Sequence, residues 1–195
     1  MTVKDRLAEL GIELPAVAAA AGSYLLSVQS GNLLFTAGQL PFVDGRLPAT
    51  GRVGAEVSPE DAKEYARVCG LNLLAVIDAA VGLDKVERIV KVVGFVASAE
   101  GFTGQPGVIN GVSDLLAEVF GESGRHARSA VGVAELPLGA PVEVEAIGQP
   151  EARARWAADH RYLEAIAAGV ETDDPRLDHP GMRDAHAHNR SRTIT

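Results

Sequence analysis

Arg128 is the residue whose type and neighbours point most directly to chemistry. It lies in the alternating run 127–133, where Ala130 and Gly132 share its face because side chains alternate along a strand. Small residues beside a charge leave room for a ligand. This run therefore indicates a site beside Arg128, although a solvent-exposed face with an Arg–Glu pair is the plainer interpretation.

Two glutamates in a second alternating run, Glu143 and Glu145, are candidates for acid–base chemistry. A Pro/Gly-rich turn separates the two runs, so residues 126–147 are predicted to form a β-hairpin. In that register Glu145 lies diagonal to Arg128 and is its expected partner. Glu143 lies on the order of 13 Å from Arg128. A shared ligand then requires either a bulge that shifts the register or a site across a subunit interface.

Each candidate residue also has a purely structural interpretation. An exposed Arg–Glu pair would contribute only about 0–1 kcal/mol to stability. Gly38 ends a predicted strand, which indicates a bulge or a close approach of the backbone to a ligand. Cys69 falls on an apolar helical stripe, which favours a small buried hydrophobe over a reactive thiol. Asn110 lies in the first turn of a predicted helix, where polar side chains are usually solvated.

The composition is that of an ordinary soluble globular protein. The chain has 195 residues, of which 47% are hydrophobic and 23% charged, and its net charge is −8. It has no basic cluster, zinc-ligand spacing or nucleotide-binding motif, so we expect no nucleic-acid partner, metal or nucleotide cofactor. Because it has no secretory signal, no apolar run of roughly 18 residues and a single cysteine, we expect a cytoplasmic protein without a membrane partner.

The hydrophobic periodicity predicts an α+β sheet with two helices on one face. Apolar residues on both faces of the strand 86–97 indicate that the second face is covered by other subunits. The expected elements are a helix over 3–10 closed by Gly11, two strands within 24–40 around a turn at 30–32, a helix from Ser58 to Gly82, a strand over 86–97, a helix over 107–120 and two strands within 127–147.

Three regions are predicted along the chain. Residues 1–21 form an N-terminal helix and linker, and residues 22–150 form the main domain. Residues 151–195, which have little apolar content after a possible short helix over 152–168, are predicted to be a largely disordered extension. Its pair His186 and His188 would suit weak metal binding, although a solvated tail is the favoured interpretation.

Two motifs resemble the Rid family of reactive-intermediate deaminases, also known as the YjgF/YER057c/UK114 family. The stretch 31–39 (Gly-Asn-Leu-Leu-Phe-Thr-Ala-Gly-Gln) resembles an early strand of that family, and 127–137 with 142–146 resembles its C-terminal signature. The resemblance covers residues 22–148. It implies a chorismate-mutase-like fold, a homotrimer and ligand sites between subunits.

The resemblance also implies roles for five residues. Arg128 matches the arginine that binds the substrate carboxylate, and Glu143 matches the glutamate that holds or activates water. Gly38 matches a backbone position that lines the site. Tyr24 matches a site tyrosine. Asn110 matches a site asparagine, although its spacing to Arg128 is one residue longer than the family pattern.

The activity implied by the resemblance is hydrolytic deamination of 2-imino and enamine acids, such as 2-aminoacrylate, to 2-keto acids and ammonia without a metal or organic cofactor. The expected enzyme is thus similar to a 2-iminobutanoate/2-iminopropanoate deaminase. Ala37 and Ala130 stand where well-known members carry serine and cysteine, which leaves substrate choice open. The alternatives are a non-catalytic trimer that binds small carboxylates or acts as a chaperone-like regulator and, disfavoured by the acidic charge, an endoribonuclease.

Overall fold

The computed structural model describes residues 1–18 and 22–151. The predictions made for residues 152–195, including the short helix and the two tail histidines, lie outside this part of the chain. No helix in the described residues is long and apolar enough to cross a membrane.

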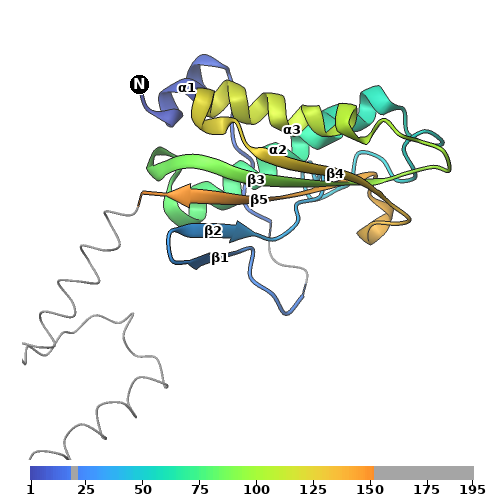
Figure 1. Cartoon of the computed structure of the whole chain (residues 1–195), viewed down its shortest axis with the longest axis horizontal. Helices are drawn as coiled ribbons and strands as arrows, with labels where there is room; N and C mark the ends of the chain where they lie inside the picture. Colours follow the sequence, from blue (N-terminus) through green and yellow to red (C-terminus); the bar gives the residue numbers. More distant parts are fainter. Residues whose placement is uncertain (19–21, 152–195) are drawn as a thin grey trace, which may run out of the picture. The chain divides into compact units, whose positions relative to one another are not determined.

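Five strands form one mixed sheet in the order β1-β2-β5-β3-β4 (Figure 1). All neighbouring strands are antiparallel except β3 and β4, which are parallel. The predicted order of elements along the chain and the α+β class are confirmed. The strands are β1 (Ser27–Ser30), β2 (Leu33–Thr36), β3 (Val86–Ala97), β4 (Ala127–Val133) and β5 (Val142–Pro150).

The hairpin predicted over residues 126–147 is wrong. Its two strands exist, but the long strand β3 lies between them and pairs with both. The connection contains a 3₁₀ turn, Pro137–Gly139, with Leu138 and Gly139 at positive φ. Strand β3 has apolar residues on both faces, which suits its position between β5 and β4 in the sheet.

Two long helices cover one face of the sheet, as predicted. Helix α2 (Pro59–Val81) begins after Ser58, whose hydroxyl accepts the backbone N–H of Asp61 at 3.0 Å, and ends at Gly82, which has φ of 81°. Helix α3 spans Gln105–Phe120 and begins two residues before the predicted start. Two 3₁₀ turns, Leu83–Lys85 and Gly121–Gly124, lead from these helices into β3 and β4.

Helix α1 (Val3–Glu9) also packs against this core. Thr2 and Asp5 form a capping box at its start, and Gly11 follows its end with a positive φ, as predicted. Leu7 is buried in the same hydrophobic cluster as the residues of α2 and α3. The N-terminal helix is therefore anchored on the main domain.

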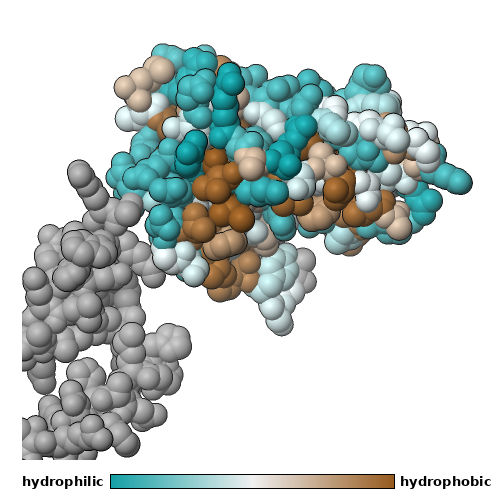
Figure 2. Space-filling view, viewed as in Figure 1, coloured by the Kyte–Doolittle hydropathy of each residue, from teal (hydrophilic) through white to brown (hydrophobic). Residues whose placement is uncertain are grey.

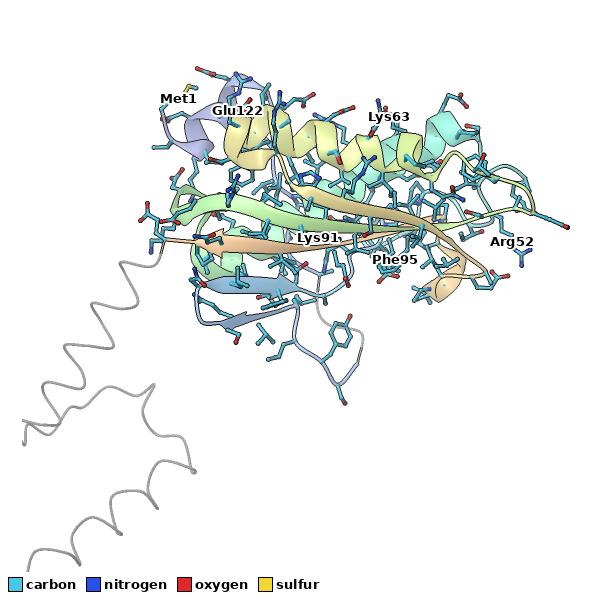
Figure 3. The ribbon with its side chains drawn as sticks, viewed as in Figure 1. Met1, Arg52, Lys63, Lys91, Phe95 and Glu122 are labelled. Carbon is cyan, nitrogen blue, oxygen red and sulfur yellow. The ribbon has the colours of Figure 1, made fainter. Side chains whose placement is uncertain are left out.

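The other face of the sheet is not covered by helices and is called the open face below. Val28, Phe35 and Val131 on this face are 51%, 40% and 44% exposed. The strand pairing places Phe35 beside Ile147 and Phe95 beside Val131, so the apolar side chains form rows across the strands. Figure 2 shows hydrophobic residues gathered over the strands, and Figure 3 labels Lys91 and Phe95 on β3.

Candidate functional site

Arg128 lies on the edge strand β4 and reaches across to the first turns of α3. Its Nη1 donates to Asn110 Oδ1 at 2.8 Å and to Ser113 Oγ at 3.1 Å, and its Nη2 donates to the carbonyl oxygen of Pro106 at 3.3 Å. Although its spacing to Arg128 is one residue longer than the family pattern, Asn110 thus contacts the arginine. Residues 113 and 106 were not predicted to contact the arginine.

The guanidinium keeps donors for a ligand. Three of its N–H groups are used by α3, and in the part of the chain that the structure describes its Nε–H and second Nη2–H have no acceptor. An Nε–H and an Nη2–H of one guanidinium can together bind the two oxygens of a carboxylate. The expected partner Glu145 is not one, because it aligns with Val93 and Ser129 on the open face.

His126 is a residue of this site that the sequence analysis did not single out. Its Nδ1 lies 2.6 Å from the carbonyl oxygen of Gly124, and its Nε2 lies 3.1 Å from Ser113 Oγ. Burial, and secondarily the charge of Arg128, lowers the pKa of this histidine below its ordinary value, while its hydrogen bond to Gly124 acts in the opposite direction. Its position two residues before Arg128, on the same strand face, was the available signal.

Glu143 and Gly38 lie in direct contact. A Cβ atom at Gly38 would overlap the Glu143 carboxylate, so only glycine leaves the space that this side chain occupies. Gln39, the next residue, pairs with Val144 through backbone hydrogen bonds of 2.8 and 3.1 Å, which fixes the approach. Burial, together with the nearby charge of Glu145, raises the pKa of Glu143 above the usual value for a glutamate.

Arg128 and Glu143 lie on opposite faces of the sheet within one chain. Arg128 is paired with the buried Val92, whereas Glu143 is paired with Phe95 on the open face. Val92 and Phe95 are three residues apart on β3, so their side chains point to opposite faces. The distance between Arg128 and Glu143 that was expected from the hairpin therefore does not apply. Within one chain the two charged groups cannot contact the same small ligand.

Tyr24 lies just before β1 and is half exposed. The backbone N–H of Ala37 donates to the carbonyl oxygen of Leu26 at 2.8 Å, so the segment that carries Tyr24 runs beside the segment that leads to Gly38. The predicted residues Tyr24, Gly38 and Glu143 thus come from the segments that flank the β1–β2 pair and from β5. Arg128 and Asn110 come from β4 and α3.

The room predicted beside Arg128 is only partly present. A Cβ atom at Gly132 would lie 2.9 Å from Gln105 Nε2 and from Ser98 Oγ, so these two side chains fill the space over this glycine. Gln105 is held there by hydrogen bonds to Ser98 Oγ at 3.1 Å and to the carbonyl oxygen of Phe102 at 2.8 Å. Ala130 remains the small residue beside Arg128.

Cys69 has the structural role that its position on the apolar stripe favoured. It is completely buried in α2, and this burial raises the pKa of its thiol well above the ordinary value. The thiol is therefore protonated at neutral pH. Within residues 1–18 and 22–151, no group of three or more His, Cys, Asp or Glu side chains lies close enough together to hold a metal ion.

Comparison with known proteins shows which family the chain belongs to. A family model described as YjgF/chorismate mutase-like, with an endoribonuclease label, matches residues 4–145. The chain belongs to the YjgF family. The predicted resemblance to this family and its chorismate-mutase-like fold is thereby confirmed.

The alignments with two relatives and one solved structure cover nearly the whole length of each of those proteins. Protein TCP17 of Trypanosoma cruzi is 49% identical over 147 residues, which are 74% of this chain and 92% of that protein. The 2-iminobutanoate/2-iminopropanoate deaminase of Escherichia coli is 37% identical over 131 residues, which are 66% of this chain and 88% of the enzyme. The crystal structure of Atu1372 from Agrobacterium tumefaciens, a protein of unknown function, matches with a TM-score of 0.71 and 46% identity over 76% of this chain and 92% of that one.

Proposed function

We propose that the protein hydrolyses reactive 2-imino and enamine acids to 2-keto acids and ammonia. The observation that carries this proposal is the Arg128 guanidinium, which is fixed by three oxygen acceptors of α3 while its Nε–H and one Nη2–H remain free to bind a carboxylate. In the described residues no carboxylate lies within ion-pair distance of this arginine. Its charge is thus available to an anionic substrate.

Glu143 is the proposed base or orienting group for the attacking water. Water adds to the imine carbon, the nitrogen takes up a proton, and the resulting carbinolamine releases ammonia to leave the keto acid. A positioned general base contributes about 10²–10⁴-fold to such a step. The backbone at Gly38, in contact with Glu143, would line the substrate, and the Tyr24 hydroxyl would donate a proton or hydrogen bond to the nitrogen.

The site requires two chains, since Arg128 and Glu143 lie on opposite faces of one sheet. We propose a homotrimer in which the open face packs against neighbouring subunits and β4 of one subunit approaches Glu143 of the next. The exposed Val28, Phe35 and Val131 supply apolar area for this contact. The assembly would cover the open face and complete the site at the same time.

The E. coli relative named 2-iminobutanoate/2-iminopropanoate deaminase supports this chemistry at 37% identity. A second candidate is a trimer that binds small carboxylates without turnover, because the Arg128 fork alone would suffice for binding. The endoribonuclease label of the family model is less suitable, since the net charge of −8 opposes binding to a phosphate backbone.

A coupled assay tests the proposal. An amino-acid oxidase generates 2-imino acids in solution, and release of keto acid is followed with wild-type protein, Arg128→Ala and Arg46→Ala. Arg46 lies exposed in a loop without a side-chain partner in the described residues, so it controls for loss of one positive charge. We expect wild type and Arg46→Ala to accelerate keto-acid release and Arg128→Ala to lose the acceleration.

Two results would contradict the proposal. If Arg128→Ala retains the wild-type rate, the arginine does not bind the substrate carboxylate. If wild type fails with imino acids that carry small, large and acidic side chains, the binding protein becomes the better conclusion, which calorimetric titration with a 2-keto acid would then examine.

A further inference from the structure

His126 and Ser113 form a chain of hydrogen bonds that ends at Arg128. The carbonyl oxygen of Gly124 can only accept a hydrogen bond, so the His126 Nδ1, 2.6 Å away, is the donor. In the neutral imidazole the other nitrogen, Nε2, is then an acceptor. The Ser113 hydroxyl, 3.1 Å away, must donate to it.

This fixed direction decides what the Ser113 oxygen offers to the arginine. Because the hydroxyl proton points to His126, the lone pairs of Oγ are left for Arg128 Nη1, which donates to them at 3.1 Å. Asn110 Oδ1 accepts from the same Nη1 at 2.8 Å. Nη1 is therefore held by two acceptors, while the Nε–H and an Nη2–H have no acceptor among the described residues.

The surroundings favour the neutral imidazole. Arg128 donates to the same serine that contacts the ring, and Arg125 and Arg88 line the surface beside it. Glu122 pairs with Arg125 at 3.1 Å. An imidazolium would thus be placed among cations. Half burial of the ring acts in the same direction and lowers its pKa.

We propose that His126, acting through Ser113, is a positioning residue that orients the Arg128 guanidinium for binding the carboxylate of the substrate. This inference rests on the proposed function for the identity of the ligand, but the orientation itself belongs to the ligand-free protein. His126 does not touch the substrate in this scheme. Its role is to fix the direction in which the Ser113 hydroxyl proton points.

Two substitutions separate positioning from simple support of the loop. In His126→Gln the side-chain amide oxygen takes the place of Nε2 and can accept from Ser113, but it cannot titrate. In His126→Asn the amide takes the place of Nδ1, so the bond to Gly124 is kept and the bond to Ser113 is lost. If His126 only anchors residues 121–126, the asparagine variant should behave like wild type and the glutamine variant should not.

The kinetic test compares these variants with Ser113→Ala in the coupled assay. We expect KM to rise about tenfold in His126→Asn and Ser113→Ala, because the loss of one hydrogen bond to a charged group has an effect of this size. The value of kcat should change by less than about twofold. His126→Gln should retain a KM near that of wild type. Equal KM values for wild type, His126→Asn and Ser113→Ala would overturn the proposal, as would a glutamine variant that is worse than the asparagine variant.

A measurement on the ligand-free protein keeps this test independent of the enzyme activity. The Nε–H and Nη–H signals of Arg128 are assigned in ¹⁵N-labelled full-length protein by their absence from Arg128→Lys. We expect them to be sharp in wild type and His126→Gln and broadened in His126→Asn and Ser113→Ala. Unchanged signals in all variants would overturn the positioning role even if the protein deaminates imino acids, and the expected pattern would support it even if no deamination is found.

Discussion

Arg128 is distinguished by what surrounds it. The other arginines with side-chain partners in the described chain, such as Arg52 and Arg67, form ion pairs with glutamates. Arg128 instead contacts neutral oxygens of Asn110, Ser113 and Pro106. A guanidinium that is oriented but not neutralised is suited to bind an anion, because a bound carboxylate then meets a full positive charge.

Replacing Arg128 by lysine should separate charge from geometry. Lysine keeps the positive charge but cannot offer two parallel N–H donors. We expect kcat/KM for an imino acid to fall by about two orders of magnitude, with a circular dichroism spectrum like that of wild type. A lysine variant with wild-type kcat/KM would mean that charge alone suffices and that the fork has no role.

The two glutamates of β5 interact through their charges, which gives a prediction on pH. Glu145 helps to raise the pKa of Glu143, and as a base Glu143 must be ionised, so activity should fall on the acid side as Glu143 takes up a proton. Glu145→Gln removes this repulsion, and the acid limb of kcat should then move to lower pH. The profile is measured in a His126→Gln background, where the imidazole does not titrate.

The control for this substitution is Glu64→Gln on the exposed side of α2. It also removes one negative charge, but from a different element of the fold. It should leave the acid limb in place. An acid limb that is the same in Glu145→Gln and in Glu64→Gln would show that Glu143 is not the group that titrates in turnover.

At the scale of the elements, the close packing of α2 and α3 positions Asn110 and Ser113 over β4. A Cβ atom at Gly111 would overlap the carbonyl oxygen of Lys63 on α2, so the two helices approach to backbone contact at this glycine. Asn110 precedes this contact directly and Ser113 follows within one turn. The acceptors of Arg128 are therefore placed by helix packing.

Gly111→Ala should destabilise the fold, because the added methyl group must push the helices apart. We expect a loss of about 1–3 kcal/mol in the free energy of unfolding, measured with urea. Gly107→Ala on the same helix is the matched control, since nothing lies within 4 Å of an added Cβ there. Alanine at this exposed helical position should instead stabilise by about 0.5–1 kcal/mol. The same sign for both substitutions would contradict the packing argument.

At the scale of the whole molecule, the open face of the sheet is the feature that calls for a partner. Its apolar side chains form two groups, with Val28 and Phe35 beside Ile147 and Phe95 beside Val131, and Lys91 and Glu143 extend the same rows. Exposed apolar side chains that gather on one face, rather than lying singly, mark an interaction surface. A second copy of the chain is the partner that would also supply the missing half of the site.

Phe35→Asp should disrupt the assembly, because it places a charge between the apolar side chains of Val28 and Ile147 on this face. We expect the wild-type protein to elute as a trimer with light-scattering detection and Phe35→Asp as a folded monomer without activity. Val43→Asp is the matched control, since Val43 is 50% exposed and lies outside the five strands. A wild-type monomer with full deaminase activity would contradict the proposed assembly.

Much of the fold follows from local sequence. The Ser58 cap, Pro59 and Gly82 define α2 because capping depends on neighbours in the chain, and the turn around Gly31 separates β1 from β2 for the same reason. The apolar run 86–97, with apolar residues on both faces, predicted β3 with the bounds that the structure has. The motif around Arg128 was enough to identify the family.

The pairing of strands did not follow from local sequence. The runs 127–133 and 142–147 have the alternation of a hairpin, and a strand 30 residues earlier in the chain lies between them. Short-range patterns carry no information on which distant strand fills a gap in a sheet. For that reason the expected Arg128–Glu145 contact and the expected distance to Glu143 were wrong.

The sequence by itself thus determined the elements, the family and the residue types of the site, since these depend on periodicity, caps and motifs. The tertiary structure decided the rest. It placed Arg128 and Glu143 on opposite faces of one sheet, brought Ser113 and His126 to the arginine, and closed the space over Gly132. Those relations depend on which distant segments pack together, because hydrogen bonds between side chains require contacts that no local pattern encodes.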